Sequence, residues 1–274
     1  MHIQSILYDL IIVIYACSVL FYFFDFLQNN RKANKIAFWL LSIVWISQTI
    51  YVSQVFLQEA LPFWSKFDTL FLFSWLLITL SLLVNIFFRM DIFLFFTNVV
   101  GFSIMAMSMF LESRNISEEL ATHFTSGWLV IHITMAFLSY AAFTLSAIFS
   151  VIYLYQHRLL KQKKWNNQMK RGPSLAQLDK ASFFLNIAAV PLLFLSLILG
   201  SIWAFHTLEG AEWIFDSKVI LSVFVLLMYT IYLFQRVVRG WTGKRITELN
   251  VICFFILVVN YVLSNLFSTF HLWT

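Results

Sequence analysis

The chain has few charged residues, and this scarcity excludes an ordinary soluble fold. Only 11% of its 274 residues are Asp, Glu, Lys or Arg, whereas soluble domains average about 25%. Hydrophobic residues make up 61% of the chain and include 32 Phe, 10 Trp and 10 Tyr. A soluble core could not bury this much apolar surface, so the composition predicts a membrane protein whose solvent is largely lipid.

The sequence also lacks the short motifs that carry most enzyme and metal chemistry. Its two cysteines occur without a CxxC or CxxCH pattern, which excludes a zinc site of that type and covalent haem attachment. No GxSxG, HExxH, P-loop or dinucleotide-binding glycine pattern is present. The long apolar stretches hold no central Lys, Arg or Glu, which argues against a pump driven by buried charges. We therefore predict that the protein is not an enzyme. The asparagines within the apolar stretches, Asn85, Asn186 and Asn260, are expected to form interhelical hydrogen bonds.

What the chain does contain is a series of long apolar stretches, each near the roughly 20 residues that a helix needs to cross a bilayer. The stretches are 6–27, 36–57, 67–88, 92–111, 127–155, 183–204, 218–238 and 247–270. They are continuous and do not alternate over roughly 10 residues, so they predict helices and not barrel strands. The predicted fold is all-α and polytopic, with about eight transmembrane helices. We divide it into an N-terminal four-helix segment, 1–126, and a C-terminal four-helix region, 127–274.

Basic residues are distributed unevenly among the connecting loops. All but three of the 18 Lys and Arg residues lie in or beside the loops after the first, third, fifth and seventh stretches; the exceptions are Lys66, Arg114 and Lys218. Cytoplasmic loops carry the excess of Lys and Arg in membrane proteins, so both termini are predicted to be extracytoplasmic. The most basic segment, 156–171, is expected either to lie at anionic lipid headgroups or to dock a cytoplasmic protein. Nucleic acid is not expected as a partner.

Histidines supply the candidate site. His132 lies early in the fifth stretch, His206 follows the sixth and His271 lies at the outer end of the eighth, directly after residue 270, so all three are predicted at a similar depth on the outer side. Imidazole is a common axial ligand of haem iron, and two facing histidines could occupy both axial positions. A single interfacial histidine is more often only an amphipathic residue, so a structural role stays open at this point.

The outer loop between the sixth and seventh stretches, WAFHTLEGAEWIFDSK, is rich in aromatic residues. It contains Trp203, Trp213 and Phe215, whose flat faces can pack against a porphyrin, together with His206 and Asp216. The same composition also suits an interfacial aromatic belt, so this loop alone supports both interpretations.

With these residues, the region 127–274 resembles the cytochrome c assembly family of haem-handling membrane proteins, which includes the CcsA and CcmC types. The family's loop motif, WGxxWxWD, aligns with EGAEWIFD at 209–216. Gly210, Trp213 and Asp216 match, whereas Glu209 and Phe215 replace tryptophans. Similar flanking pieces are HITMAFLSYAAFTLSAIFSVIYLYQHRLLK at 132–161, SLAQLDKAS at 174–182, GSIWA at 200–204, RGWTGKR at 239–245 and SNLFSTFHLW at 264–273. The first four stretches match only in being apolar.

The resemblance implies that His132 and His271 are the axial ligands of a haem iron, with Trp213, Asp216 and His206 shaping the pocket. Length, span number and the altered motif are most similar to the HemX-type branch of Gram-positive bacteria. That branch implies a multi-pass plasma-membrane protein associated with haem biosynthesis and with a lowered level of glutamyl-tRNA reductase. The implied partners are haem, the lipid bilayer, and that reductase or another cytoplasmic protein of the haem pathway.

Two other functions stay open. One is a component that presents haem during maturation of c-type cytochromes, which an intact tryptophan motif would favour. The other is a haem-free scaffold that acts through the basic cytoplasmic loop, which the absence of a haem Soret band would favour.

Overall fold

The computed structural model describes residues 2–58, 66–88, 90–109, 127–163, 172–207, 210 and 212–267. Within these ranges the chain is helical, and eight of its helices are long and apolar enough to cross a membrane. No strand occurs in the described part of the chain. The predicted all-α polytopic fold with eight spans is therefore confirmed.

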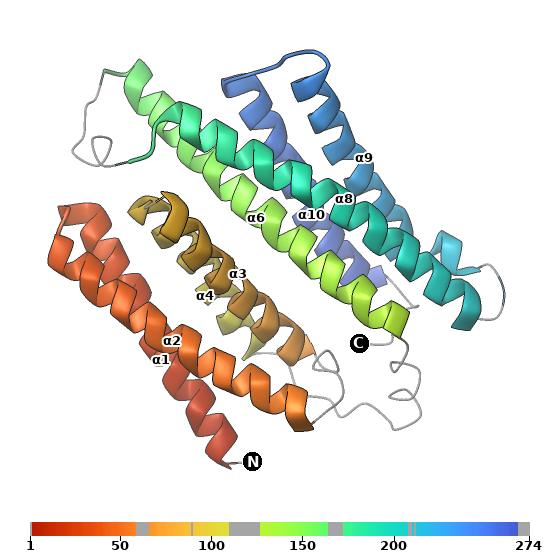
Figure 1. The fold of residues 1–274 in the computed structure, drawn as a ribbon, viewed down its shortest axis with the longest axis horizontal. Coiled ribbons are helices and arrows are strands. Elements are labelled where there is room, and N and C mark those ends of the chain that lie inside the picture. The colour runs from red at the N-terminus through yellow and green to blue at the C-terminus, as the bar shows by residue number, and fades with distance from the viewer. Residues whose placement is uncertain are drawn as a thin grey trace. The chain divides into compact units, whose positions relative to one another are not determined.

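The first compact unit comprises residues 1–116 together with 165–173. Its described helices are α1 (His2–Gln28), α2 (Arg31–Gln58), α3 (Lys66–Phe88) and α4 (Asp91–Ser108) (Figure 1). α1 packs against α2 and α4, and α3 packs against α4. Tyr8 donates a hydrogen bond to the Met105 carbonyl at 2.7 Å, and Tyr15 donates to Asn98 Oδ1 at 3.1 Å. Such bonds stabilise helix pairs in lipid, where the hydrophobic effect does not drive helices together.

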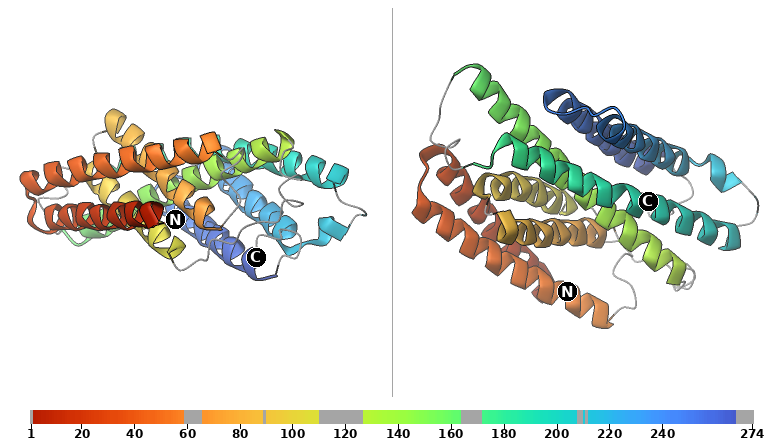
Figure 2. Two further views of the ribbon diagram at one scale, coloured as in Figure 1. Left: turned by 90° about the horizontal axis from the view of Figure 1, so that it is seen from below. Right: turned by 45° about the horizontal axis from the view of Figure 1, so that its top comes forward.

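The second unit comprises residues 117–164 and 174–274, and every described site residue predicted from the sequence belongs to it. Its described elements are α6 (Gly127–Lys161), α8 (Leu175–Thr207), the 3-10 helix η1 (Glu212–Phe215), α9 (Ser217–Val237) and α10 (Lys244–Phe267). α6 and α8 lie side by side over most of their length, and α10 packs against α6 and α9 (Figures 1 and 2). In the core, the rings of Phe143 and Tyr229 stack with centroids 3.7 Å apart.

The register of α6 against α8 is fixed by hydrogen bonds from side chains to backbone carbonyls, repeated every seven residues. The bonds are His132 Nδ1 to Ser196 O at 2.6 Å, Ser139 Oγ to Ala189 O at 3.0 Å and Ser146 Oγ to Ser182 O at 3.0 Å. Seven residues are about two helical turns, so the three donors share one face of α6. Each step of seven along α6 matches a step of seven back along α8, so the two helices are antiparallel. We call these three bonds the α6–α8 ladder.

A buried polar cluster joins α6, α8 and α10. Its members are Ser146, Ser150, Ser182, Asn186 and Asn250, each at most 4% exposed. Asn186 Nδ2 donates to Asn250 Oδ1 at 2.9 Å, and Asn250 Nδ2 donates to Ser150 Oγ at 2.7 Å. The expectation that Asn186 bonds between helices is therefore confirmed. In a bilayer such bonds are worth about 0.6 kcal/mol each on average, so the cluster specifies how three helices meet.

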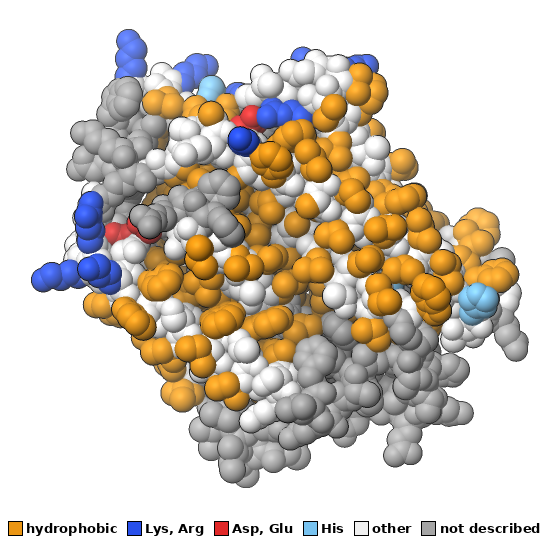
Figure 3. All heavy atoms as spheres, viewed as in Figure 1, with side chains coloured by type: hydrophobic (Ala, Val, Ile, Leu, Met, Phe, Trp, Pro, Cys, Tyr) orange, Lys and Arg blue, Asp and Glu red, His pale blue; other side chains and the backbone are white. Residues whose placement is uncertain are grey.

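Basic side chains gather at the end of the second unit where α6 finishes and α9 turns into α10. The described Lys and Arg residues there are Arg158, Lys161, Lys163, Lys180, Arg236, Arg239, Lys244 and Arg245. Figure 3 shows Lys and Arg at this end, and hydrophobic side chains cover the face beside it. At the opposite end, the described residues include one basic side chain, that of Lys218. By the excess of Lys and Arg that cytoplasmic loops carry, this asymmetry predicts that the basic end lies in the cytoplasm.

We expect the C-terminus to be extracytoplasmic and the basic loop to be cytoplasmic. Reporter fusions at Thr274 and within 161–171 should therefore give opposite signals, with the periplasmic-type reporter active only at Thr274. A cytoplasmic signal at Thr274 would contradict this orientation, and it would also move His132 to the inner face.

Candidate functional site

His132 lies in the second turn of α6, and its ring packs against α8. Its Nδ1 is 2.6 Å from the backbone oxygen of Ser196 and 3.1 Å from the Ser196 hydroxyl. A carbonyl oxygen can only accept a hydrogen bond, so Nδ1 must carry the ring proton. In the neutral ring Nε2 then holds a lone pair, and no described residue forms a hydrogen bond with it. The ring is therefore held in the form that can bind a metal through Nε2.

Ser196 also binds the backbone of α6. Its hydroxyl donates to the carbonyl oxygen of His132 at 3.0 Å, so the two residues are joined in both directions. One turn further along α8, Gly200 faces the same ring. A Cβ at Gly200 would lie 2.6 Å from Cε1 and 2.7 Å from Nδ1 of His132, closer than side-chain atoms approach one another. The imidazole therefore occupies the space that a side chain at position 200 would need.

Two further residues predicted from the sequence, Trp203 and His206, lie on α8 after Gly200. Trp203 is half-buried and lies on the same face as Ser196 and Gly200, because these positions follow the helical repeat. His206 is exposed, and its ring meets the edge of Phe205 with centroids 5.6 Å apart. The described contacts of His206 do not include His132, so the structure joins His132 to α8 without bringing these two histidines together.

The matched loop residues Gly210 and Asp216 have local structural roles. Gly210 has a φ of +88°, a backbone conformation that glycine adopts without strain. Asp216 is the N-cap of α9, and its Oδ1 accepts a hydrogen bond from the Lys218 backbone N–H at 2.8 Å. An aspartate in this position satisfies a donor that the first turn of a helix leaves free. Both residues therefore shape the connection that leads into α9.

The aromatic residues of the loop lie in η1. Trp213 is half-buried, whereas Phe215 is 79% exposed. Because α6 and α8 are antiparallel, α8 ends at the same end of the unit as α6 begins. η1 follows α8 and precedes α9, so it belongs to that end as well. His271, the predicted second axial ligand, lies outside the described residues.

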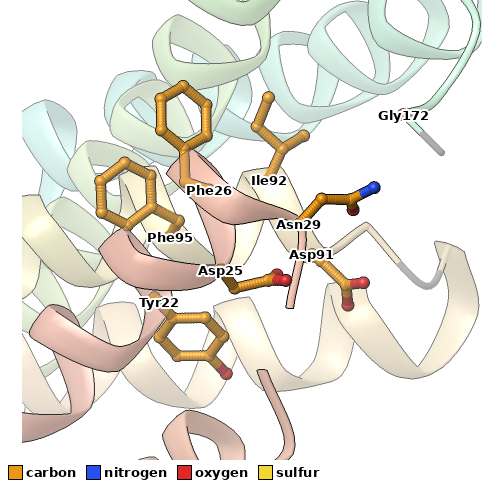
Figure 4. A pocket seen from close by; sticks show the side chains of 8 residues that line it. All are labelled: Tyr22, Asp25, Phe26, Asn29, Asp91, Ile92, Phe95 and Gly172. Atoms are coloured by element: carbon orange, nitrogen blue, oxygen red, sulfur yellow. The ribbon is translucent and has the colours of Figure 1, made fainter. Parts of the chain in front are cut away.

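A cavity lies in the first unit. It is lined by Tyr22, Asp25, Phe26, Asn29, Asp91, Ile92, Phe95 and Gly172 (Figure 4). Asp25 Oδ2 accepts a hydrogen bond from Asn34 Nδ2 at 2.9 Å, which ties the cavity wall to α2. None of the described site residues that the sequence predicted lines this cavity. Among the described residues, no group of three His, Cys, Asp or Glu side chains is placed to hold a metal ion.

Ser196 and Gly200, which contact His132, were not among the site residues predicted from the sequence. Two signals were available. Position 132 continues a series of seven-residue steps through Ser139 and Ser146, and Ser196 continues a matching series on α8. GSIWA, one of the pieces on which the resemblance was based, begins at Gly200. Neither signal identifies the pairing of the two helices, which only the structure provides.

An all-helical fold with eight apolar spans, together with a histidine held against a neighbouring helix near one end, defines a polytopic membrane protein with a candidate metal-ligand site. The chain belongs to the cytochrome c assembly protein family, which it matches over residues 63–271. It is a multi-pass protein of the bacterial plasma membrane.

Relatives refine this placement within the family. The chain is 48% identical over 261 residues to Protein HemX of Bacillus subtilis (strain 168), covering 95% of this chain and 94% of the relative. It is 45% identical to Protein HemX of Brevibacillus brevis, covering 97% of each chain. It is 25% identical over an alignment of 278 positions to the cytochrome c biogenesis protein CcsA of Cyanophora paradoxa, which covers 85% of this chain and 82% of that protein. No solved structure matches the chain.

These matches extend further toward the N-terminus than the resemblance over 127–274. The family match begins at residue 63, so it includes α3 and α4, and the HemX matches cover nearly the whole chain. The N-terminal helices are therefore part of what the chain shares with its relatives, in addition to being apolar.

Proposed function

We propose that this protein binds haem at the extracytoplasmic face of the plasma membrane, with His132 and His271 as the axial ligands. The observation that carries the proposal is the hydrogen bond from His132 Nδ1–H to the Ser196 carbonyl. Metal-bound histidines almost always donate their other ring N–H to a carbonyl, a carboxylate or water, which fixes the tautomer and the ring orientation. The family's description as cytochrome c assembly proteins supports haem as the ligand.

The residues at this end of the second unit suit a porphyrin. Trp213 and Phe215 offer flat apolar faces, and Phe215 is exposed enough to reach a ligand. Because Asp216 caps α9, we propose that its role is to support the loop. His206 is exposed at the end of α8, which suits a secondary contact. Haem bound here would supply a redox-active iron centre.

The test of this function is the haem content of the whole protein. Protein purified in mild detergent from haem-replete cells should carry about one haem per chain, measured by the pyridine haemochrome assay against protein concentration. A correctly folded sample without haem would contradict the proposal and favour the haem-free scaffold.

We further propose a regulatory role in haem biosynthesis, in place of catalysis. Glutamyl-tRNA reductase, or another cytoplasmic protein of the haem pathway, would be the partner. The HemX relatives support this branch of the family. Because His132 and the described basic residues Arg158 and Lys161 lie near opposite ends of α6, we propose that α6 and α8 provide the connection between the haem site and the basic segment.

The basic loop should carry the regulatory output. Replacing its Lys and Arg residues with Gln should raise the reductase level several-fold in vivo, because a basic docking surface would be lost. The substituted residues are Lys161, Lys163, Lys164, Lys170 and Arg171. The matched control is Lys244→Gln with Arg245→Gln in the α9–α10 turn, which should leave the level unchanged. Reporter fusions must first show unchanged insertion, and an unchanged reductase level in correctly inserted protein would contradict this role.

A further inference from the structure

We propose that Ser196 and Gly200 are positioning residues that present His132 Nε2 to the iron. Together they form what we call the α8 cradle: a carbonyl that fixes the ring proton on Nδ1, a hydroxyl that binds the backbone of α6, and a missing side chain that admits the ring. The role of the cradle toward iron rests on the proposed function. Its geometry can be tested on protein that contains no haem.

Gly200 supplies the space. Glycine inside a helix is disfavoured relative to alanine, so its presence in the last third of α8 needs a physical reason. The 2.6 Å separation between a Cβ at position 200 and Cε1 of His132 gives that reason, since the ring rests directly on the α8 backbone. A ring seated in this way cannot move closer to α8.

Ser196 fixes the ring proton of His132 on Nδ1. Its carbonyl accepts from Nδ1–H at 2.6 Å, and its hydroxyl donates to the His132 carbonyl at 3.0 Å. The first bond decides the tautomer, and the second holds the α6 backbone at the same level. The cradle therefore determines which nitrogen stays available for a ligand.

The α6–α8 ladder shows why a histidine is needed at this step. Ser139 and Ser146 form the other two bonds of the ladder with a hydroxyl alone, each at 3.0 Å. A serine at position 132 could continue the ladder without requiring a glycine on α8. Helix packing therefore explains the bond to Ser196 but not the imidazole. What the imidazole adds is a second nitrogen with an available lone pair.

The first test uses haem-free protein and the tautomer of His132. The chain is labelled with ¹⁵N-histidine in detergent micelles, and the His132 signals are assigned by their loss in His132→Ala. We expect the ¹⁵N shifts of a fixed Nδ1–H tautomer for His132 and of averaged tautomers for the exposed His206. An Nε2–H tautomer, or averaging at His132, would overturn the cradle whether or not the protein binds haem.

The second test uses haem affinity and the absorption spectrum. The Cβ of Gly200→Ala would displace the ring from its position, so this variant should weaken haem retention by about 10- to 100-fold, the range for disturbing the orientation of a metal ligand. It should also shift the iron away from the six-coordinate spectrum. Gly101→Ala is the matched control, since its Cβ would lie 2.5 Å from the Tyr15 hydroxyl in the first unit. That variant should keep the wild-type spectrum. A wild-type spectrum in Gly200→Ala would overturn the proposal. If the wild-type protein itself carries no haem, the proposed function is wrong, and the tautomer measurement alone then decides whether the cradle exists.

A double variant decides the case in which Gly200→Ala fails to fold. Removing the ring leaves room for a Cβ, so His132→Ala combined with Gly200→Ala should fold as well as His132→Ala alone. That non-additivity would show that the clash is with the imidazole. If the double variant also misfolds, Gly200 serves helix packing independently of His132, and the cradle is wrong.

Discussion

His132→Ala is expected to remove most of the haem from the purified protein. The substitution removes an axial ligand. The loss of haem affinity should therefore be larger than the about 10- to 100-fold loss that follows when a residue orienting a ligand is replaced. The iron that remains should be five-coordinate or water-ligated, with a shifted Soret band. His271→Ala should have an equally large effect, because two imidazoles are required for a six-coordinate iron. The measurement is haem per chain together with the absorption spectrum.

Two other histidines provide the controls. His157 lies near the end of α6 remote from His132, and its ring stacks on that of Tyr153 with centroids 6.0 Å apart. His157→Ala should therefore leave the haem content unchanged, and His206→Ala should reduce it slightly or to an intermediate level. If both His132→Ala and His271→Ala retain the wild-type spectrum, bis-histidine ligation is wrong and the family relationship describes ancestry alone.

Arg236→Ala is expected to destabilise the protein by about 3 kcal/mol, the lower end of the cost of breaking a buried ion pair. Arg236 pairs with Asp179, and their side chains are only 12% and 20% exposed. It also donates to the Trp241 carbonyl at 3.1 Å and lies over the Phe183 ring at 5.2 Å. Removing one partner of a largely buried ion pair leaves the other charge uncompensated, which is far more costly than losing an exposed pair. The change should appear in thermal or SDS unfolding of the protein in micelles.

The matched control is the pair of Lys244 and Glu248 on α10. Their charged atoms are 3.2 Å apart, but the side chains are 57% and 48% exposed. Exposed pairs at this helical spacing contribute about 0.3–0.5 kcal/mol, so Lys244→Ala should barely change unfolding. Equal effects of Arg236→Ala and Lys244→Ala would contradict the assignment of the Arg236–Asp179 pair as a tie between α8 and α9.

The spans were predictable because the bilayer sets their length. A helix that crosses it needs a long apolar run, and such runs can be counted in the sequence without knowledge of any contact. The position of His132 early in its span was predictable for the same reason. Asn186 in an apolar stretch indicated an interhelical bond, and the structure supplies Asn250 as its partner.

The partners of His132 were not predictable in this way. Ser196 is 64 residues away in the sequence, and nothing local indicates that α6 pairs with α8 or in which register. The seven-residue series on both helices could have suggested the pairing, but many apolar helices carry serines at such spacings. Asp216 illustrates a different limit. The motif identified the residue, whereas its role as the cap of α9 required the backbone geometry of the loop.

The most direct measurement of the central claim is the electron paramagnetic resonance spectrum of the ferric, haem-loaded protein in mild detergent, recorded with its absorption spectrum. Two imidazole ligands predict a low-spin, six-coordinate signal that disappears in His132→Ala and persists in His157→Ala. A high-spin signal in the wild-type protein, or a low-spin signal unchanged in His132→Ala, would contradict axial ligation by His132.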